Sequence, residues 1–233
     1  MKITGFKKGP AEYEGVIVFR GPISQRKENL NRFFEAGERD ILNETPGKLI
    51  CGEHYIRSYI LSSSTAPAEG ALWTEKNVKF LCPYSFWIKE ETKQFFKQNE
   101  IQPEDGLDYP YDYEYDYTAQ KAGTASWYID HFAKSKFKMT IYGPCVNPRI
   151  LINGYPYEVF DTLEAGEYMV IDSRENTVLK YLTNGTIQNI YDLRAKKQSV
   201  FEKIPAGNLD IVWSGAFGFD ITLFLERSEP RWN

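Results

Sequence analysis

The stretch Phe80–Trp87, Phe-Leu-Cys-Pro-Tyr-Ser-Phe-Trp, marks the point at which the sequence pattern changes. Val78, Phe80 and Cys82 are spaced by two residues, so they would share one face of a strand. Pro83 lacks the backbone N–H that a central strand uses in its ladder, and the strand is therefore predicted to end there. We expect a seam between two domains at this stretch.

The two sides of the seam predict different architectures. Residues 1–83 are predicted to form an α+β module with one helix, and residues 84–233 an antiparallel β-sandwich, so that the fold class is mainly β. The residues predicted to join the two domains are Pro83, Tyr84 and Trp87. Because no low-complexity linker separates the halves, the domains should be closely coupled.

One helix is predicted before the seam, over Ile23–Ala36. Leu30, Phe33 and Phe34 lie at i, i+3 and i+4, which is the spacing of an apolar stripe. Pro22 and Ser24 mark the start of the helix, and Gly37 occupies the position of a left-handed C-terminal cap.

The remaining segments of this half read as strands and a loop. Gly15–Phe19 is a short apolar run that predicts a strand, and Lys48–Leu61 predicts a hairpin that turns at residues 51–53. Ser62–Gly70 is small and polar and contains Pro67, so a loop is predicted there. Ile88–Lys97 could be read as a helix or a strand from its residues alone.

After the seam, short alternating segments predict a sandwich. Phe137, Met139 and Ile141 alternate with polar residues, and the last two strands alternate in the same way at residues 209–213 and 219–225. Asn153-Gly154 and Asn184-Gly185 are dipeptides typical of tight hairpin turns.

Composition excludes several classes of protein. The net charge is −4 with no basic block, which disfavours binding to nucleic acid or an anionic membrane. Three widely spaced cysteines do not form a disulfide framework and favour a reducing compartment. With no signal peptide and no membrane-length apolar run, the sequence predicts a soluble protein made in a cytoplasm.

Catalytic chemistry has little support. His54 and His131 are the only histidines, and the Cys51-x-x-His54 spacing lacks the second pair that a zinc site needs. There is no nucleophile elbow, P-loop or dinucleotide fingerprint. The predictions are therefore no enzyme, no catalytic residue, no cofactor and no metal.

Asp108–Tyr117 is the most distinctive segment. Tyrosines alternate with Asp, Glu and Pro, which predicts an extended strand with a tyrosine face and an acidic face. The tyrosine face is predicted to be core or subunit interface, or else a platform for sugars. The acidic face would be solvated, would meet a basic partner or, less favourably, would bind calcium. The interface candidates here are Tyr109, Tyr111, Tyr113 and Tyr115.

Several motifs together resemble one family. They are "FLCPYSFW" at 80–87, "LDYPYDYEYDY" at 107–117, "MTIYGPCVNPRILING" at 139–154, and the segments 164–192 and 204–232 with their Asn-Gly, Pro-x-Gly-x-Asn and Pro-x-Trp patterns. In order and spacing they resemble the distal tail protein, or tail-tip hub, of siphophages and prophages of Gram-positive bacteria. The resemblance covers nearly the whole chain.

The resemblance implies a structural role in a virion. Such proteins form a hexameric ring at the tail tip, with an N-terminal belt around a channel for passing DNA and a galectin-like C-terminal sandwich. The partners implied are other copies of the chain, the tail tube protein, the tail-associated fibre or lysin protein, and receptor-binding proteins, without a membrane. Assembly in the host cytoplasm is implied, and residues 88–97 would form a strand.

Two points temper the resemblance. Only Met1–Arg20 precedes the helix, whereas the family has further strands there, so the belt would be abbreviated or completed differently. The rival hypothesis is a carbohydrate-binding module that recognises host cell-wall polysaccharide through the Tyr109–Tyr117 face.

Overall fold

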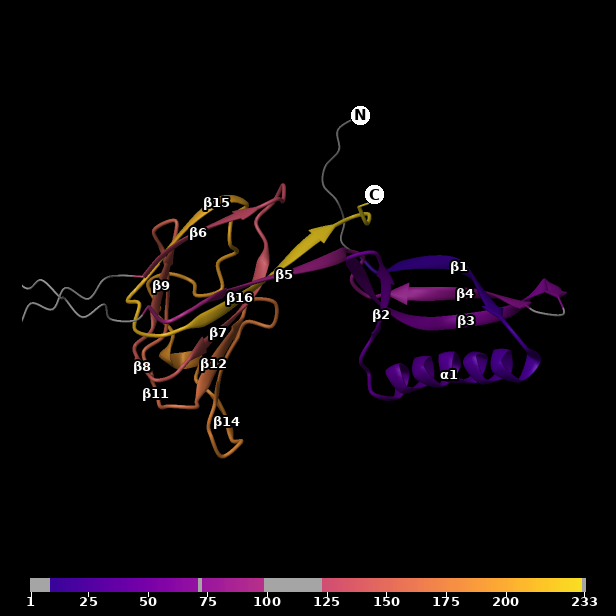
Figure 1. Cartoon of the computed structure of the whole chain (residues 1–233), viewed down its shortest axis with the longest axis horizontal. Coiled ribbons are helices and arrows are strands. Elements are labelled where there is room, and N and C mark those ends of the chain that lie inside the picture. Colours follow the sequence, from indigo (N-terminus) through magenta and orange to yellow (C-terminus); the bar gives the residue numbers. More distant parts are fainter. Residues whose placement is uncertain (1–8, 71–72, 99–122, 232–233) are drawn as a thin grey trace, which may run out of the picture. The chain divides into compact units, whose positions relative to one another are not determined.

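The computed structural model describes residues 9–70, 73–98 and 123–231 of the chain (Figure 1). It separates into two compact units. Unit 1 comprises Met1–Lys89 and Glu226–Asn233, and unit 2 comprises Glu90–Leu225. The division into units falls between Lys89 and Glu90 and assigns Glu226–Asn233 to unit 1, while the domain boundary at 83/84 stays a prediction.

Unit 1 is a small antiparallel sheet with one helix along it (Figure 1). Its elements are β1 (Ala11–Arg20), α1 (Ile23–Leu42), β2 (Gly47–Cys51), β3 (His54–Gly70), β4 (Trp73–Cys82) and the start of β5 (Trp87–Phe95). The strand order is β1-β4-β3, with β2 also paired to β3.

Helix α1 is longer than its apolar stripe predicted. It continues past Ala36 to Leu42, so the prediction that Gly37 caps the helix is wrong. Gly37 is buried inside the helix, where a Cβ atom would lie 2.5 Å from Cδ1 of Ile60 on β3. Glycine at this position therefore permits a close approach of helix to strand instead of a turn of the chain.

The hairpin of β2 and β3 is confirmed, with Cys51 opposite His54 and Gly52 at φ 57°. The loop predicted over Ser62–Gly70 is wrong, because β3 continues to Gly70. Ser63 and Ser64 pair with Val78 and Asn77 of β4. A long partner strand thus supplies ladder hydrogen bonds that outweigh the weak strand propensity of serine.

The seam itself has the predicted local structure. Strand β4 ends at Cys82, directly before Pro83, and Val78, Phe80 and Cys82 are buried while Lys79 is exposed. Residues 87–95 form β5, which confirms the strand reading of this segment.

Unit 2 is built from antiparallel sheets. Its remaining elements are β6 (Gly123–Ile129), β7 (Lys136–Tyr142), β8 (Cys145–Val146), β9 (Arg149–Ile152), β10 (Tyr155–Glu158), β11 (Thr162–Leu163), β12 (Tyr168–Asp172), β13 (Thr177–Tyr181), β14 (Ile187–Asn189), η1 (Tyr191–Leu193), β15 (Gly207–Trp213) and β16 (Phe219–Arg227). One sheet has the order β5-β16-β7-β12-β13-β14, a second has β10-β9-β15-β6, and β8 pairs with β11 (Figure 1).

The core of unit 2 matches the alternation of its strands. Phe137, Met139 and Ile141 are fully buried, as are Leu209 and Ile211 of β15. The β9–β10 turn is made by Asn153-Gly154, with φ of 49° and 78°, as the dipeptide predicted. The mainly β fold class is confirmed, with α1 as the one α-helix in the described part of the chain.

Candidate interaction surfaces

The sheet of unit 1 has one covered and one open face. On the covered face, Phe19 of β1 is buried and meets Phe33 of α1 edge to face, with ring centroids 5.9 Å apart. On the open face, Val16 and Val18 are 60% and 40% exposed. We call this second surface the open sheet face.

The sequence of β1 indicates this surface, although predicting a strand from its local residues does not reveal it. Residues 16–19, Val-Ile-Val-Phe, are apolar without alternation, so they place apolar side chains on both faces of β1. A strand of this kind normally has both faces covered, but α1 covers only one. The side chains of Val16 and Val18 are therefore exposed in a single chain.

Charged residues border the two valines. Glu14 lies opposite Lys79 in the β1–β4 register, and the two form an exposed ion pair of 2.7 Å. This hydrogen bond and charge pairing raise the pKa of Lys79. At the other end, a shallow hollow is lined by Val18, Arg20, Gly21, Pro22, Trp73 and Glu75. An apolar centre with a charged border is the usual composition of a protein interface.

Strand β1 is also an edge of the sheet. It pairs with β4 alone over Ala11–Arg20, so its other side carries no ladder partner within the described residues. A long edge strand is a surface on which a further chain can add main-chain hydrogen bonds. The open sheet face and this edge are contiguous.

The residues predicted to join the domains have different environments. Pro83 is exposed, whereas Trp87 is buried in a small core with Ile56 and Cys82. The rings of Trp87 and Tyr13 meet edge to face at 6.4 Å. Trp87 thus packs within unit 1, and its role as a joint stays a prediction.

Tyr84, the third candidate, is half-buried. Burial, followed by a hydrogen bond to the Glu226 side chain, raises the pKa of the Tyr84 phenol. The contact ties the segment after Pro83 to the end of β16. The other interface candidates, Tyr109, Tyr111, Tyr113 and Tyr115, lie outside the described residues, as does the whole predicted strand at 108–117.

A different group of tyrosines lies across three strands of unit 2. Tyr168 is opposite both Tyr142 and Tyr181 in the strand registers. The Tyr168 and Tyr181 rings stack at 4.6 Å with an interplanar angle of 6°, so each covers a face of the other. The Tyr142 hydroxyl donates to Asp220 at 2.7 Å. Sugar stacking needs an open ring face, and the mutual stacking occupies one face of each of these two rings.

Within the described ranges, no cluster of His, Cys, Asp and Glu could hold a metal ion. Cys51, Cys82 and Cys145 are free thiols, and burial raises the pKa of the Cys145 thiol to about 11. A thiol in that state is a poor nucleophile at neutral pH. No helix in the described part of the chain has the length and apolar character needed to cross a membrane.

The fold is that of phage tail hub proteins. The chain is similar to the SPP1 Dit protein (gp 19.1), described as a paradigm of the hub adsorption apparatus in phages that infect Gram-positive bacteria, with a TM-score of 0.53 and 9% identity. The match covers 96% of this chain and 80% of that one.

A second similarity is to chains of the phage P2 baseplate. The activated baseplate with Ca and the same baseplate with Sr give TM-scores of 0.52 at 13% and 12% identity, and each match covers 96% of this chain and 81% of the other. Neither a protein-family model nor a curated protein sequence matches the chain. The resemblance predicted from sequence motifs is thus confirmed as a resemblance of fold.

Proposed function

We propose that this chain is a structural component of a phage or prophage tail tip, without catalytic activity, that assembles as a ring of identical copies. Six copies are expected from the resemblance. The ring would join the tail tube protein to the tail-associated fibre or lysin protein, offer a site to receptor-binding proteins, and let DNA pass through its centre. It would form in the host cytoplasm and reside at the tip of the virion.

The observation that carries this proposal is the open sheet face. Val16 and Val18 expose an apolar half-row on a sheet whose opposite side is already packed on α1. Isolated exposed apolar residues are ordinary, but a contiguous apolar strip beside a free sheet edge is typical of a surface that another chain covers. A closed ring uses contacts of this kind, in which one surface of each copy meets a different surface of the next.

Native mass spectrometry of the full chain tests the proposal. We expect a closed oligomer in the wild type, and loss of that oligomer in the double variant Val16→Glu/Val18→Glu, because two carboxylates would have to be buried at the contact. Val146→Glu is the matched control, since Val146 is 68% exposed on β8 of unit 2. Circular dichroism confirms that each variant is folded.

Two results would overturn the proposal. One is a wild-type chain that stays monomeric at high concentration and is absent from tail tips labelled with gold-conjugated antibody. The other is a Val16→Glu/Val18→Glu variant that assembles as well as the Val146→Glu control.

The carbohydrate-binding alternative gains nothing from the described residues. The segment on which it depends lies outside them, and the Tyr168–Tyr181 stack covers one face of each ring. A glycan array with the full chain tests that alternative directly.

A further inference from the structure

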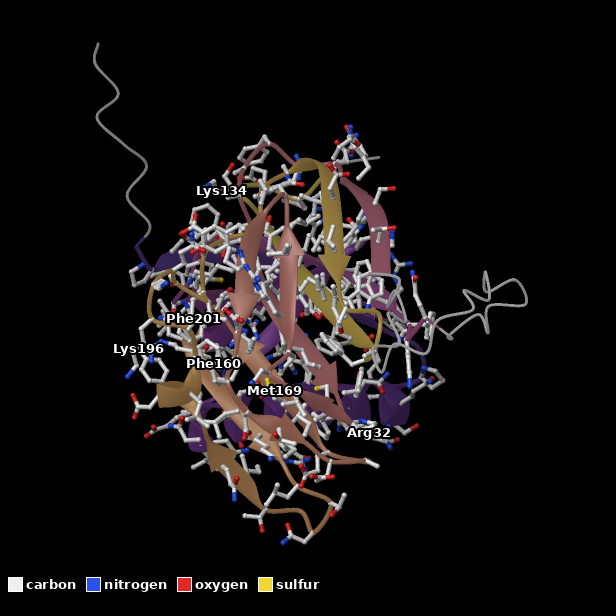
Figure 2. The ribbon with its side chains drawn as sticks, turned by 90° about the vertical axis from the view of Figure 1, so that its left-hand side faces the viewer. Arg32, Lys134, Phe160, Met169, Lys196 and Phe201 are labelled. Carbon is white, nitrogen blue, oxygen red and sulfur yellow. The ribbon has the colours of Figure 1, made fainter. Side chains whose placement is uncertain are left out.

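A second surface, on unit 2, combines exposed aromatic side chains with basic ones. Phe160, Tyr191 and Leu193 are 50%, 37% and 41% exposed. They are neighbours, since the Phe160 amide donates to the Leu193 carbonyl at 2.8 Å. Figure 2 places Phe160, Phe201 and Lys196 on one side of this unit. We call this surface the basic aromatic patch; its residues are Phe160, Tyr191, Leu193, Arg194, Lys196, Lys197 and Phe201.

Stacking holds the patch in shape. The Tyr191 ring has the Arg194 guanidinium carbon 3.6 Å from its centroid, and it also stacks with Phe201 at 5.9 Å and 18°. Arg194 donates through Nη1 to the Tyr191 carbonyl at 2.7 Å, and its backbone bridges to Val159. A surface whose side chains are already ordered loses little entropy on binding.

The charge of the patch is opposite to that of the chain. Residues 191–203 carry four basic and two acidic side chains, whereas the whole chain has a net charge of −4. Of the two acids, Glu202 is paired with Lys134 at 3.0 Å, which leaves Asp192 beside the patch. Within the described residues, Arg194, Lys196 and Lys197 form no ion pair with a carboxylate.

The chain also contains a segment of matching chemistry. Residues 100–118 carry seven acidic side chains and five tyrosines, with no lysine or arginine. Acidic side chains complement the lysines, and tyrosines complement the aromatic and apolar part of the patch. The stretch 99–122 has 24 residues. Half of that length can span at most roughly 40 Å, at about 3.3 Å per residue.

We propose that the acidic tyrosine segment 100–118 of one copy docks on the basic aromatic patch of the neighbouring copy. This inference rests on the proposed ring. A closed ring needs two different complementary surfaces on each copy, and this pair satisfies that need. The contact would use unit 2 alone and would tie the second units of adjacent copies together.

Zero-length carbodiimide cross-linking tests the contact, because the reagent joins lysine amines to carboxylates that touch them. Unlabelled and ¹⁵N-labelled full chains are mixed in equal amounts, assembled, cross-linked and digested. We expect links from Lys196 or Lys197 to acidic residues of 100–118, in pairs of one labelled and one unlabelled peptide. Links made only within one isotope, or no links from these lysines, would overturn the proposal.

A pair of variants measures the strength of the contact. Lys196→Gln/Lys197→Gln should weaken self-association by roughly twofold to thirtyfold, as expected for two exposed ion pairs. Lys138→Gln, a change at an exposed lysine of β7, should leave it unchanged. Equal association of both variants would count against the contact. If native mass spectrometry shows a ring while these tests fail, the docking is wrong and the ring stands; a monomeric wild type removes both.

Discussion

Replacing Gly37 with alanine tests whether glycine is present at this position because α1 packs closely on β3, and not because the chain turns there. Alanine in a helix interior is favoured over glycine by about 1 kcal/mol. Against this, the new Cβ would lie 2.5 Å from Cδ1 and 3.2 Å from Cγ1 of Ile60. Overpacking of this kind costs about 1–3 kcal/mol, so we expect a net loss of about 1 kcal/mol in the stability of unit 1.

The partner change Ile60→Val removes the Cδ1 atom and leaves the 3.2 Å contact to Cγ1. Alone it should cost about 0.5–1 kcal/mol, because Ile60 is only half-buried. In the double variant the clash is relieved and the helix preference of alanine returns. We therefore expect Gly37→Ala/Ile60→Val to be at least as stable as Ile60→Val. The cost of Gly37→Ala would then disappear in the Ile60→Val background, which corresponds to a coupling energy of about 1–2 kcal/mol between the two changes.

Native-state hydrogen exchange resolved by peptide is the suitable assay, because a chain of two units need not unfold in one step. The opening free energy of α1 peptides reports the effect. Ile41→Val is the matched control, since Ile41 lies on α1 but is 53% exposed, and it should not couple to Gly37→Ala. A Gly37→Ala protein that is more stable than wild type with Ile60 intact would refute the packing argument.

Two further predictions concern unit 1. Trp87→Ala should lower the opening free energy of this unit by about 3–5 kcal/mol, because Trp87 is 7% exposed within a core. Hydrogen exchange in unit 2 should stay unchanged. A loss of assembly with unaltered exchange in unit 1 would show that Trp87 is only a joint. Burial, with the nearby charges of Arg227 and Lys89 outweighing that of Glu53, lowers the pKa of His54 below 6.5. Folding is then favoured above pH 6.5 and weakened as the pH falls below it, because the unfolded chain binds the proton more readily. Thermal melts between pH 7.5 and 5 should show this loss, and His54→Gln should reduce it; equal slopes for both proteins would contradict the assignment.

Local sequence determined the features that depend on neighbouring residues. The alternation of Phe137, Met139 and Ile141 defined a strand and its buried face, since side chains of a strand point to opposite faces in turn. Asn153-Gly154 defined a turn because both residues accept positive φ. Pro83 ended β4 because it has no N–H to donate.

Tertiary structure decided what depends on residues far apart in the chain. The serines after Ile60 became strand because β4 lies beside them, and the need for glycine at position 37 comes from the close approach of Ile60 on β3. The candidate sites follow the same rule: an apolar run predicted β1, but only the placement of α1 on one face left Val16 and Val18 exposed on the other. Likewise, Phe160 and Tyr191 belong to one patch only because the Val159–Arg194 bridge brings their segments together.

Propensity acts over a few residues, whereas burial and strand pairing are properties of the folded chain.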